Sequence, residues 1–452
     1  MAAGARRART PRLRPEQRRG QLLDAALAVA EADGFDAVTV ASVVKRAGVT
    51  RPVLYDLFGD LDGLLHALIE REEARALAVL AEVVVDDPGE RDPDAYLVAA
   101  VARLLEAVAA EPRTWRLVLL PPQGSPPALR ERVGASRAAV TARVEALLAW
   151  GIPRRGGPAG LDLPVLAHLL VAAGEDAGRL VLSRPRRFTP RRLTAAARGL
   201  LALLPPDGAA APEGPPAAGE RPAPGERSAS AGPAAAGEPG AAAAPPTGRM
   251  PQAQRREQLL DATLALVARE GFDALSVEAV ARAAGVNRVV VYRCFASLPL
   301  LVAALLRREQ RRIERALEAI VPADPAGAHP RALLLDGLDG LLAAVAADPL
   351  SWRLALAPAE SAPAAVRTLV ARRRRAVERR TRRLVAWGVG GLAIPAEQVD
   401  VEVLAQVLLS AAEQCGRLLL DGRFGPARLR AAAAGLVAAV PWVPPPEAAA
   451  KR

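Results

Sequence analysis

The feature that most constrains this chain of 452 residues is a long internal repeat. The segment RRGQLLDAALAVAEADGFDAVTVASVVKRAGV begins at Arg18, and RREQLLDATLALVAREGFDALSVEAVARAAGV begins at Arg255 and aligns with it without a gap. The same spacing of 237 residues relates Trp115 to Trp352, far beyond this first segment. Each repeat is long enough to bury a core of its own, so we predict two tandem units of one fold.

The composition of both copies favours helices over strands. Apolar residues make up 51% of the chain but aromatic residues only 3%, so Ala, Leu and Val must build the core. Apolar side chains recur at helical spacing, as at Leu22, Ala26 and Val29, and turns rich in Pro or Gly separate such stretches. We predict an all-α fold with about nine helices in each copy.

The two copies are joined by a segment of Ala, Pro, Gly and Glu that runs from Pro205 to Gly248. It contains almost no large apolar residue, and it therefore cannot bury enough surface to offset the entropy lost on folding. We predict a disordered Ala/Pro/Gly linker over 205–248.

Charge and cysteine content narrow the class of partner. Lys and Arg number 60 against 49 Asp and Glu, a formal net charge of +11, and Arg suits phosphate and base contacts. A compositional bias of the genome gives the same excess of Arg, so charge alone does not decide for nucleic acid. Cys294 and Cys415 have no disulfide or zinc spacing, and no apolar run reaches the roughly 18 residues of a membrane span. We expect a cytoplasmic protein with no metal and no membrane partner.

Residues 39–58 and their repeat predict two short helices joined by a tight corner. Thr39 and Ser276 stand where a hydroxyl can cap the first helix, and Gly48 and Gly285 stand where the chain must turn with a left-handed backbone. Thr50 and Asn287 are suitable N-caps for the second helix, and Pro52 falls in its first turn, where a missing amide hydrogen costs nothing. The pattern is that of a helix-turn-helix.

The second helix of this motif predicts contacts with DNA. An Arg can bridge guanine acceptors in the major groove, Val and Pro can pack on thymine methyl groups, and Tyr can reach a phosphate. The side chains that we expect to contact DNA are Thr39, Thr50, Arg51, Pro52, Val53 and Tyr55 in the first copy, and Ser276, Asn287, Arg288, Val289, Val290 and Tyr292 in the second.

Both motifs resemble the TetR family of transcriptional regulators. The matching residues are Gly34, Phe35, Thr39, Val40, Ala47, Gly48, Val49, Tyr55 and Phe58, and again Gly271, Phe272, Ser276, Val277, Ala284, Gly285, Val286, Tyr292 and Phe295. The resemblance implies binding to double-stranded operator DNA, a small-molecule effector, and dimerisation through a pair of late helices. One departure stands out: the family usually has a phosphate-contacting Lys where this sequence has Leu61 and Leu298.

On this resemblance the chain divides into six segments. We predict a basic arm at 1–15, helix-turn-helix domains at 16–62 and 249–299, helical ligand-binding and dimerisation domains at 63–204 and 300–444, and the linker between them. The arm's Arg residues can follow the DNA backbone, or they can form a solubilising tail.

Other signals in the two large domains have a structural and a functional interpretation. Trp115 and Trp352 are candidate ligand contacts, although a repeated Trp at helical spacing is more often part of a core. Glu175 with Arg179, and Glu413 with Arg417, lie four residues apart and predict ion pairs along one helix face. The arginine run at 372–375 is expected on a solvated helix face, far from DNA.

Nothing in the sequence indicates an enzyme or a cofactor. The GVGGLA segment from Gly388 follows a predicted helix and lacks the third glycine of a dinucleotide loop, and the histidines share no catalytic motif. We expect a DNA-binding transcriptional regulator, a ligand-responsive repressor that acts as a single-chain pseudo-dimer on an operator with unlike halves. Pairing between chains stays open. The alternative is a small-molecule-binding or protein-interaction scaffold with degenerate helix-turn-helix domains.

Overall fold

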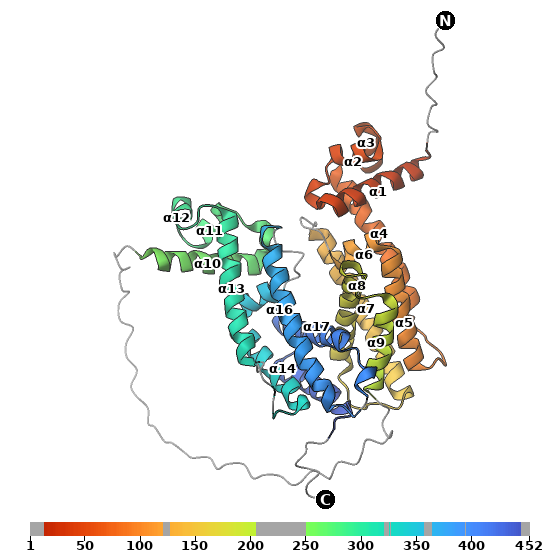
Figure 1. Ribbon diagram of the computed structural model, residues 1–452. Helices are drawn as coiled ribbons and strands as arrows, with labels where there is room; N and C mark the ends of the chain where they lie inside the picture. The colour runs from red at the N-terminus through yellow and green to blue at the C-terminus, as the bar shows by residue number, and fades with distance from the viewer. Residues whose placement is uncertain are drawn as a thin grey trace, which may run out of the picture.

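The computed structural model describes residues 13–120, 127–204, 250–320, 325, 327–356, 364–393 and 395–443 (Figure 1). The predicted linker at 205–248 and the first twelve residues of the predicted basic arm lie outside these residues. Within them the chain is built from α-helices, short 3-10 turns and one isolated β-bridge, between Leu392 and Trp442. The predicted all-α class is confirmed.

The described part of each copy contains nine α-helices in the same order. In the first copy they are α1 (Pro15–Asp33), α2 (Val40–Ala47), α3 (Arg51–Phe58), α4 (Leu61–Val83), α5 (Pro93–Ala110), α6 (Pro112–Leu119), α7 (Pro127–Arg154), α8 (Leu163–Ser183) and α9 (Pro190–Ala202). In the second they are α10 (Gln252–Glu270), α11 (Val277–Ala283), α12 (Arg288–Cys294), α13 (Leu298–Ile320), α14 (Pro330–Ala347), α15 (Pro349–Leu356), α16 (Ala364–Gly388), α17 (Val401–Leu420) and α18 (Pro426–Ala439).

Local sequence explains where many of these helices begin. Prolines at the first turn open α5, α6, α9, α14 and α18, where their missing amide hydrogens cost nothing. Asp92 and Thr189 cap α5 and α9 by accepting hydrogen bonds from Ala95 N and Arg192 N, at 2.7 and 3.2 Å. The boundaries of the helices are therefore encoded within a few residues.

Each copy has a small core around its first helices and a larger one in its body. In the first copy α1 to α4 enclose Leu22, Val43, Leu54 and Leu68, all fully buried. The second copy repeats this core between α10 and α13. Burial of these side chains fixes the short helices onto the long one that leads into the body.

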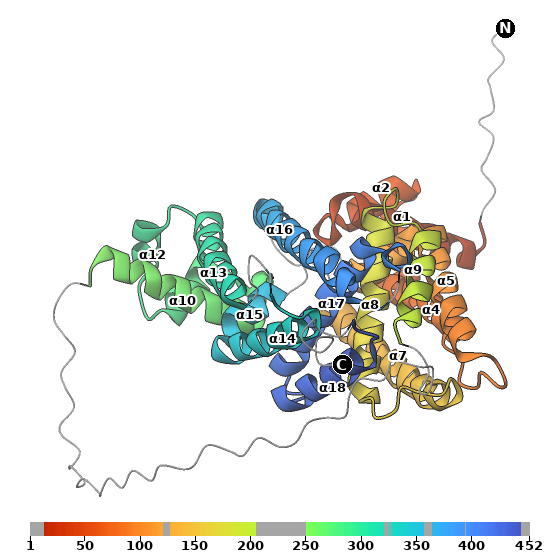
Figure 2. The same cartoon turned by 60° about the horizontal axis from the view of Figure 1, so that its bottom comes forward.

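The two copies share core residues where α8 packs against α17 (Figure 2). Val165 and Leu169 of α8 pack into the core of the second copy with Leu342 and Leu418. Val403 of α17 packs into the core of the first copy, with Val407 partly buried against it. Val165 and Val403 occupy equivalent positions in the repeat, as do Leu169 and Val407. The contact is therefore reciprocal, as in the isologous interface of a two-fold dimer.

Two equivalent ion pairs flank this shared core. Arg192 donates to both carboxylate oxygens of Asp400, at 2.7 and 2.9 Å. Arg428 does the same to Asp162, at 2.6 and 3.0 Å. Arg192 corresponds to Arg428, and Asp162 to Asp400, in the aligned repeats. The two copies are thus related by an approximate two-fold axis.

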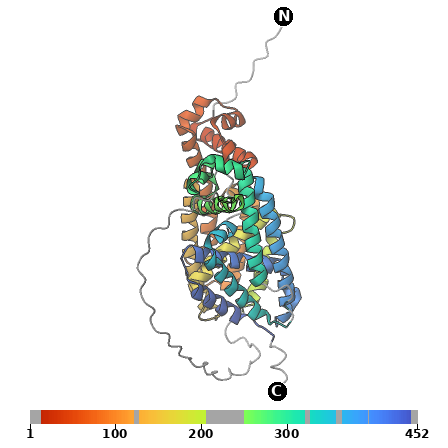
Figure 3. The ribbon, with the colours of Figure 1, turned by 90° about the vertical axis from the view of Figure 1, so that its left-hand side faces the viewer.

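Both helix-turn-helix units lie toward the same end of the molecule. Figures 1 and 3 show α1 to α3 and α10 to α12 toward the upper end, with the unit of the first copy further out. The described bodies of the two copies lie below them, with α8 and α17 between (Figure 1). This arrangement positions two similar surfaces for one extended partner.

Among the described residues, α17 is a single helix that is long and apolar enough to cross a membrane. An 18-residue stretch of this helix has a mean hydropathy of 1.3, and 44% of the stretch is buried within the protein. Helices α8, α14, α15 and α16 pack against it. Its apolar surface thus meets other helices of this chain, which is typical of a core helix.

The close approach of α9 to the second copy leads to a prediction. A Cβ added at Gly199 would lie 2.7 Å from the carbonyl oxygen of Gln398, whereas one at Gly435, the equivalent residue, meets Leu161 Cδ2 at 3.7 Å. We expect Gly199→Ala to lower the free energy of unfolding by about 1–3 kcal/mol, since backbone must move. Gly435→Ala is the matched control and should be neutral or raise stability by about 0.5–1 kcal/mol through helix propensity. Equal melting temperatures would contradict this close contact.

The reciprocal ion pairs lead to a prediction about acid. The Arg428 hydrogen bond holds the pKa of Asp162 below its ordinary value. At Asp400 burial raises the pKa, but the hydrogen bond from Arg192 and the backbone amides outweigh it. Groups with a depressed folded pKa stabilise above the ordinary value of 3.8 and lose this effect as pH falls through the folded pKa.

We therefore expect the melting temperature to fall as pH drops below about 4. The double variant Asp162→Asn with Asp400→Asn keeps both helix caps but should have a lower melting temperature at pH 7, because both ion pairs are lost. Its melting temperature should respond less to acid than that of the parent chain. Parallel pH profiles for the two proteins would contradict a role for these carboxylates.

Candidate nucleic-acid interface

The predicted caps of the first short helix are present in both copies. Thr39 Oγ1 accepts a hydrogen bond from Ser42 N at 3.1 Å, and Ser42 Oγ accepts one from Thr39 N at 2.9 Å. Ser276 Oγ accepts from Ala279 N at 3.0 Å. Gly48 then turns the chain with φ 66° and ψ 34°, and its counterpart in the second copy has φ 64°. This left-handed backbone explains the glycine at both corners.

The caps of the second helix differ between the copies. Asn287 Oδ1 accepts a hydrogen bond from Val289 N at 3.0 Å, as predicted. Thr50 stands at the N-cap of α3, but its hydroxyl forms no capping bond, so the predicted cap is wrong there. Pro52 lies in the first turn of α3, which confirms its predicted place. The exposed Thr50 hydroxyl is thus free of a structural role in the helix.

Most of the predicted contact residues project into solvent. Tyr55 and Tyr292 are 48% and 53% exposed, and Val289 is 59% exposed. Others that are exposed are Thr39, Thr50, Arg51, Pro52, Asn287 and Arg288, whereas Ser276 is half-buried. The tips of α3 and α12 therefore carry polar and apolar side chains that no described part of the chain covers.

Two valines depart from the expected orientation. Val53 is half-buried and packs on the core of α1 to α4, and Val290 is also half-buried. Each precedes a fully buried residue, Leu54 or Val291, and consecutive helical side chains are only about 100° apart. Val53 and Val290 are thus less exposed than Pro52 and Val289, and all four remain predictions as DNA contacts.

The two exposed arginines have different surroundings. Arg288 lies 3.8 Å from the carboxylate of Glu278 on α11, and both side chains are exposed. The first copy has Ala41 at the position of Glu278, and the described residues place no carboxylate within 4 Å of Arg51. Arg51 is thus available to a partner, while Arg288 must share or leave an ion pair.

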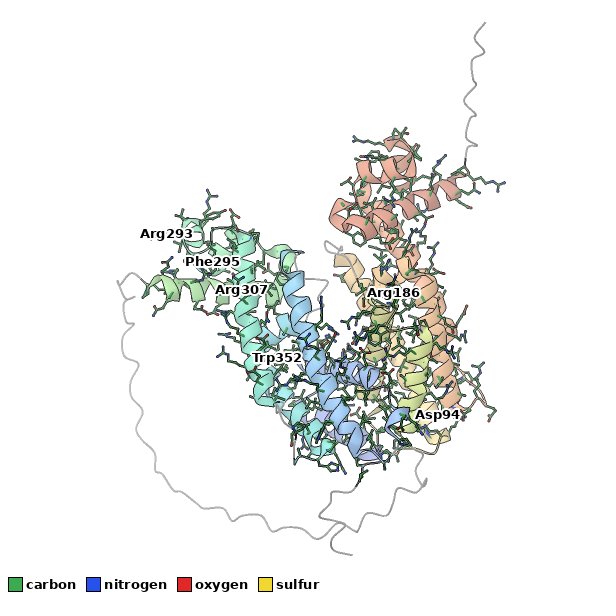
Figure 4. The ribbon with its side chains drawn as sticks, viewed as in Figure 1. Asp94, Arg186, Arg293, Phe295, Arg307 and Trp352 are labelled. Carbon is green, nitrogen blue, oxygen red and sulfur yellow. The ribbon has the colours of Figure 1, made fainter. Side chains whose placement is uncertain are left out.

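Arginines on the first helix of each copy anchor the exposed helix, and the sequence analysis missed them. Arg19 donates to Leu57 O at 3.1 Å, with its guanidinium 4.6 Å from the ring centre of Phe58. Arg256 donates to Cys294 O at 2.7 Å and lies 4.0 Å from the Phe295 ring. Figure 4 labels Phe295 below the exposed end of α12, where Arg293 lies. The exact repetition of these arginines in both copies was the available signal.

Leu61 and Leu298 occupy the position where the resemblance predicts a Lys. They are the first residues of α4 and α13, and both pack on the cores of their helix-turn-helix units. Asp60 caps α4 by accepting a hydrogen bond from Gly63 N at 2.7 Å. The start of α4 is therefore apolar and acidic.

A buried polar network in each copy connects the first helix to the body. In the first copy Asp24 of α1 pairs with Arg71 of α4 at 2.7 Å, and Arg71 pairs with the fully buried Glu72 at 2.7 Å. Glu72 in turn accepts a hydrogen bond from Thr114 Oγ1 of α6 at 2.5 Å. The network thus links α1, α4 and α6 through ion pairs and a hydrogen bond.

The second copy repeats this network. Asp261 pairs with Arg308 at 2.8 Å, Arg308 with the buried Glu309 at 2.7 Å, and Glu309 accepts from Ser351 Oγ at 2.5 Å. Sequence reasoning missed both networks, although Arg71 with Glu72 and Arg308 with Glu309 stand at equivalent positions of the repeat, which was a signal.

The candidate ligand contacts separate in the structure. An apolar cleft runs through the bodies of both copies, and Trp115 is among its lining residues. Trp352 is not, because it packs with Ile313, Val345 and Leu356 inside the second copy (Figure 4). Each tryptophan is at most 4% exposed. The cleft is therefore lined by Trp115 but not by Trp352, and both remain predictions as ligand contacts.

Two predicted charge patterns have different outcomes. Arg179 pairs with Glu175 at 3.5 Å and Arg417 with Glu413 at 3.1 Å, which confirms the predicted ion pairs. Arg374 is partly exposed and also lies 3.4 Å from the Glu413 carboxylate. The side chains of 372–373 lie outside the described residues, and the exposed members of the arginine run and its extension are Arg375, Arg379, Arg382 and Arg383.

Comparison with known proteins places these motifs in a family. The model of the bacterial regulatory proteins of the TetR family matches twice, at residues 22–68 and 259–305. These segments cover α1 to α4 and α10 to α13, the helix-turn-helix units described above. The chain thus carries two tandem helix-turn-helix units that match the TetR family.

Curated TetR-type regulators are similar to this chain over single units. The repressor KstR of Rhodococcus jostii is 35% identical over 99 residues, which are 22% of this chain and 44% of KstR. The activator FasR of Mycolicibacterium smegmatis is 29% identical over 185 residues, 41% of this chain and 80% of FasR. Among solved structures, a TetR-like regulator from Rhodococcus is 28% identical, with 43% of this chain and 99% of that one covered at a TM-score of 0.35. The match to KstR thus spans less than half of that relative.

The capping geometry predicts which of these residues matter for folding. Thr39→Ala and Ser276→Ala each remove a capping bond and should cost about 1 kcal/mol of local stability. Thr50→Ala removes a hydroxyl without a capping bond and should change local stability by less than about 0.3 kcal/mol. Native-state hydrogen exchange at the amides of α2, α3 and α11 measures these differences. Equal losses at Thr39 and Thr50 would contradict the assignment.

Proposed function

We propose that this chain is a sequence-specific DNA-binding transcriptional regulator, a ligand-responsive repressor that acts as a single-chain pseudo-dimer. One observation carries the proposal: two exposed and unlike recognition helices, α3 and α12, lie at the same end of a body with approximate two-fold symmetry (Figure 1). Two-fold regulators place such helices in successive major grooves about one helical turn apart. One chain then takes the role that two identical subunits have elsewhere.

The two recognition helices are chemically different, and we propose that they read different half-sites. The first copy presents Arg51, Pro52 and Tyr55, without a described carboxylate beside the Arg. The second presents Arg288, paired with Glu278, and Val289. Both Arg residues suit guanine, and Pro and Val suit thymine methyl groups. The operator is therefore expected to have unlike halves.

A ligand would act on DNA binding through the buried networks. The apolar cleft lies beside α6 and α8 in the first copy, and Thr114 of α6 is bonded to Glu72. Since Glu72 and Arg71 connect to Asp24 on α1, a ligand that displaces α6 changes the support of the helix-turn-helix. We propose an apolar small molecule as the effector and the cytoplasm as the place of action.

The alternative function is a small-molecule-binding or protein-interaction scaffold in which the helix-turn-helix units no longer hold DNA. The observation that favours it is the apolar and acidic start of α4, where Leu61 packs inward and Asp60 caps the helix. Intact corners, anchors and exposed Arg residues in both copies favour DNA binding. DNA selection decides between them.

Selection of purified chain on random DNA duplexes at near-physiological salt tests the proposal, because affinity depends strongly on salt. We expect one enriched motif with two unlike halves about one helical turn apart. A perfect palindrome would indicate that like copies pair between chains, and the absence of any enriched motif would favour the scaffold.

Substitutions assign each half-site to a copy. Arg51→Ala should relax one half-site and Arg288→Ala the other, each costing about 1–3 kcal/mol in binding. Glu278→Ala gives the second copy the residue of the first and should tighten DNA binding, since it removes a carboxylate that holds Arg288 and repels phosphate. Binding titrations on the selected duplex and on duplexes with either half scrambled measure these effects. If one substitution abolished the recognition of both half-sites, the proposal that each copy recognises its own half-site would be contradicted.

A further inference from the structure

The reciprocal ion pairs between the copies cannot by themselves choose which copies pair. Each copy carries an arginine and an aspartate at the same two positions: Arg192 and Asp162 in the first, Arg428 and Asp400 in the second. A pair of first copies or a pair of second copies would form the same contacts. If only these existed, like and unlike pairing would be equally favourable.

A second set of ion pairs exists in one direction only. Arg184 donates to both carboxylate oxygens of Glu378, at 3.0 and 3.1 Å. Arg187 pairs with Glu402 at 2.5 Å. In both cases the arginine belongs to the first copy and the glutamate to the second, so these contacts have no mirror image across the approximate two-fold axis.

The aligned repeats show why no mirror image exists. The first copy has Thr141 where the second has Glu378, and Pro164 where the second has Glu402. Arg184 lies in RPRRF, which the second copy shortens to GRF, so Arg184 has no counterpart there. The basic side chains of these pairs are contributed by the first copy and the acidic ones by the second.

The acidic partners are too buried to be satisfied by water alone. Glu378 and Glu402 are 11% and 18% exposed, against 33% for Arg184. A carboxylate removed from water needs an opposite charge or hydrogen bonds, and an arginine that ends at a threonine or proline loses its acceptor. A pair of first copies therefore loses the acceptors of Arg184 and Arg187, and a pair of second copies loses Arg184 at Glu378.

The centre of the interface shows a third difference of the same kind. Burial of Asp176 in α8 raises the pKa of its carboxyl. Arg179, the Ser410 hydroxyl and Arg374 of the second copy lower this pKa by more, so that it lies below its ordinary value. Ser410 Oγ is itself buried and has no well-formed hydrogen bond, so Asp176 is the polar group that it faces. The first copy has Ala172 at the position of Ser410. Two first copies would place Asp176 against alanine.

We propose that these contacts specify unlike pairing, so that a first copy associates with a second copy in preference to its own kind. Two first copies would leave Arg184 and Arg187 facing Thr141 and Pro164. Two second copies would leave Glu378 without Arg184. The inference rests on the proposed pseudo-dimer as the working unit. It implies that the contacts of the interface, in addition to the linker between the copies, determine which copies pair.

A cut chain tests this proposal directly. A protease site inserted within 205–248 allows the full-length protein to be folded first and then cut between the copies. The two halves differ in mass, so native mass spectrometry after dilution and reassociation distinguishes the unlike pair from both like pairs. Random association gives half of the dimers as unlike pairs, and we expect unlike pairs to exceed the like pairs together by at least about tenfold.

Three substitutions in the second copy should remove the preference. Glu378→Thr, Glu402→Pro and Ser410→Ala introduce the residues that the first copy carries at the same positions, including a proline that opens α8 at the equivalent site. The fraction of unlike pairs should fall toward one half. Arg184→Gln with Arg187→Gln tests the same contacts from the other side and covers the case in which the triple variant does not fold.

The matched control weakens every pair equally. Asp162→Asn with Asp400→Asn removes two reciprocal ion pairs from each kind of dimer, so all dimers should dissociate more readily while the ratio stays unchanged. A statistical mixture from the parent chain, dominant like pairs, or no dimers at all would overturn the proposal. An excess of unlike pairs that neither variant reduces would also overturn it. DNA selection with the uncut chain tests the regulator function separately, so the two can fail independently.

Discussion

The packing of α8 against α17 is the contact on which the rest of this structure depends. Each copy completes its core with side chains from the other: Val165 enters the second copy and Val403 the first. The ion pairs of Asp162 and Asp400 close the two sides of this shared core. Because apolar burial is the main driving force for association, separation of the copies would expose both cores. The relative placement of α3 and α12 is set by this junction.

The second constraint is the support of each helix-turn-helix by the body below it. Arg71 and Glu72 lie in a polar network between α1, α4 and α6, and the same network recurs in the second copy. A buried carboxylate such as Glu72 must keep its partners, so movement of one helix requires movement of the others. Together with the adjoining apolar cleft, this coupling gives the proposed effector a route to the DNA-facing surface.

Duplication within one chain allowed the copies to diverge in some places and required them to agree in others. Corner glycines, anchoring arginines and reciprocal ion pairs agree, since each maintains a fold that both copies share. Differences are found at the exposed helix, where Pro52 replaces Val289, and at the interface, where Thr141 replaces Glu378. The proposed pairing of different copies and the proposed recognition of two different half-sites both require that the two copies differ.

By itself the sequence determined the all-α class, the tandem repeat, the glycine corners and the caps at Thr39, Ser276 and Asn287. These features depend on apolar periodicity and on hydrogen bonds within about four residues, which are readable along the chain. The exposure of Tyr55 followed from the same pattern.

Tertiary structure alone decided the rest. It turned Val53 inward, placed Trp352 away from the cleft, and brought Arg184 against Glu378 across 194 residues of chain. Such contacts depend on how whole helices pack, and no local pattern specifies which charged side chain of one helix meets which of another.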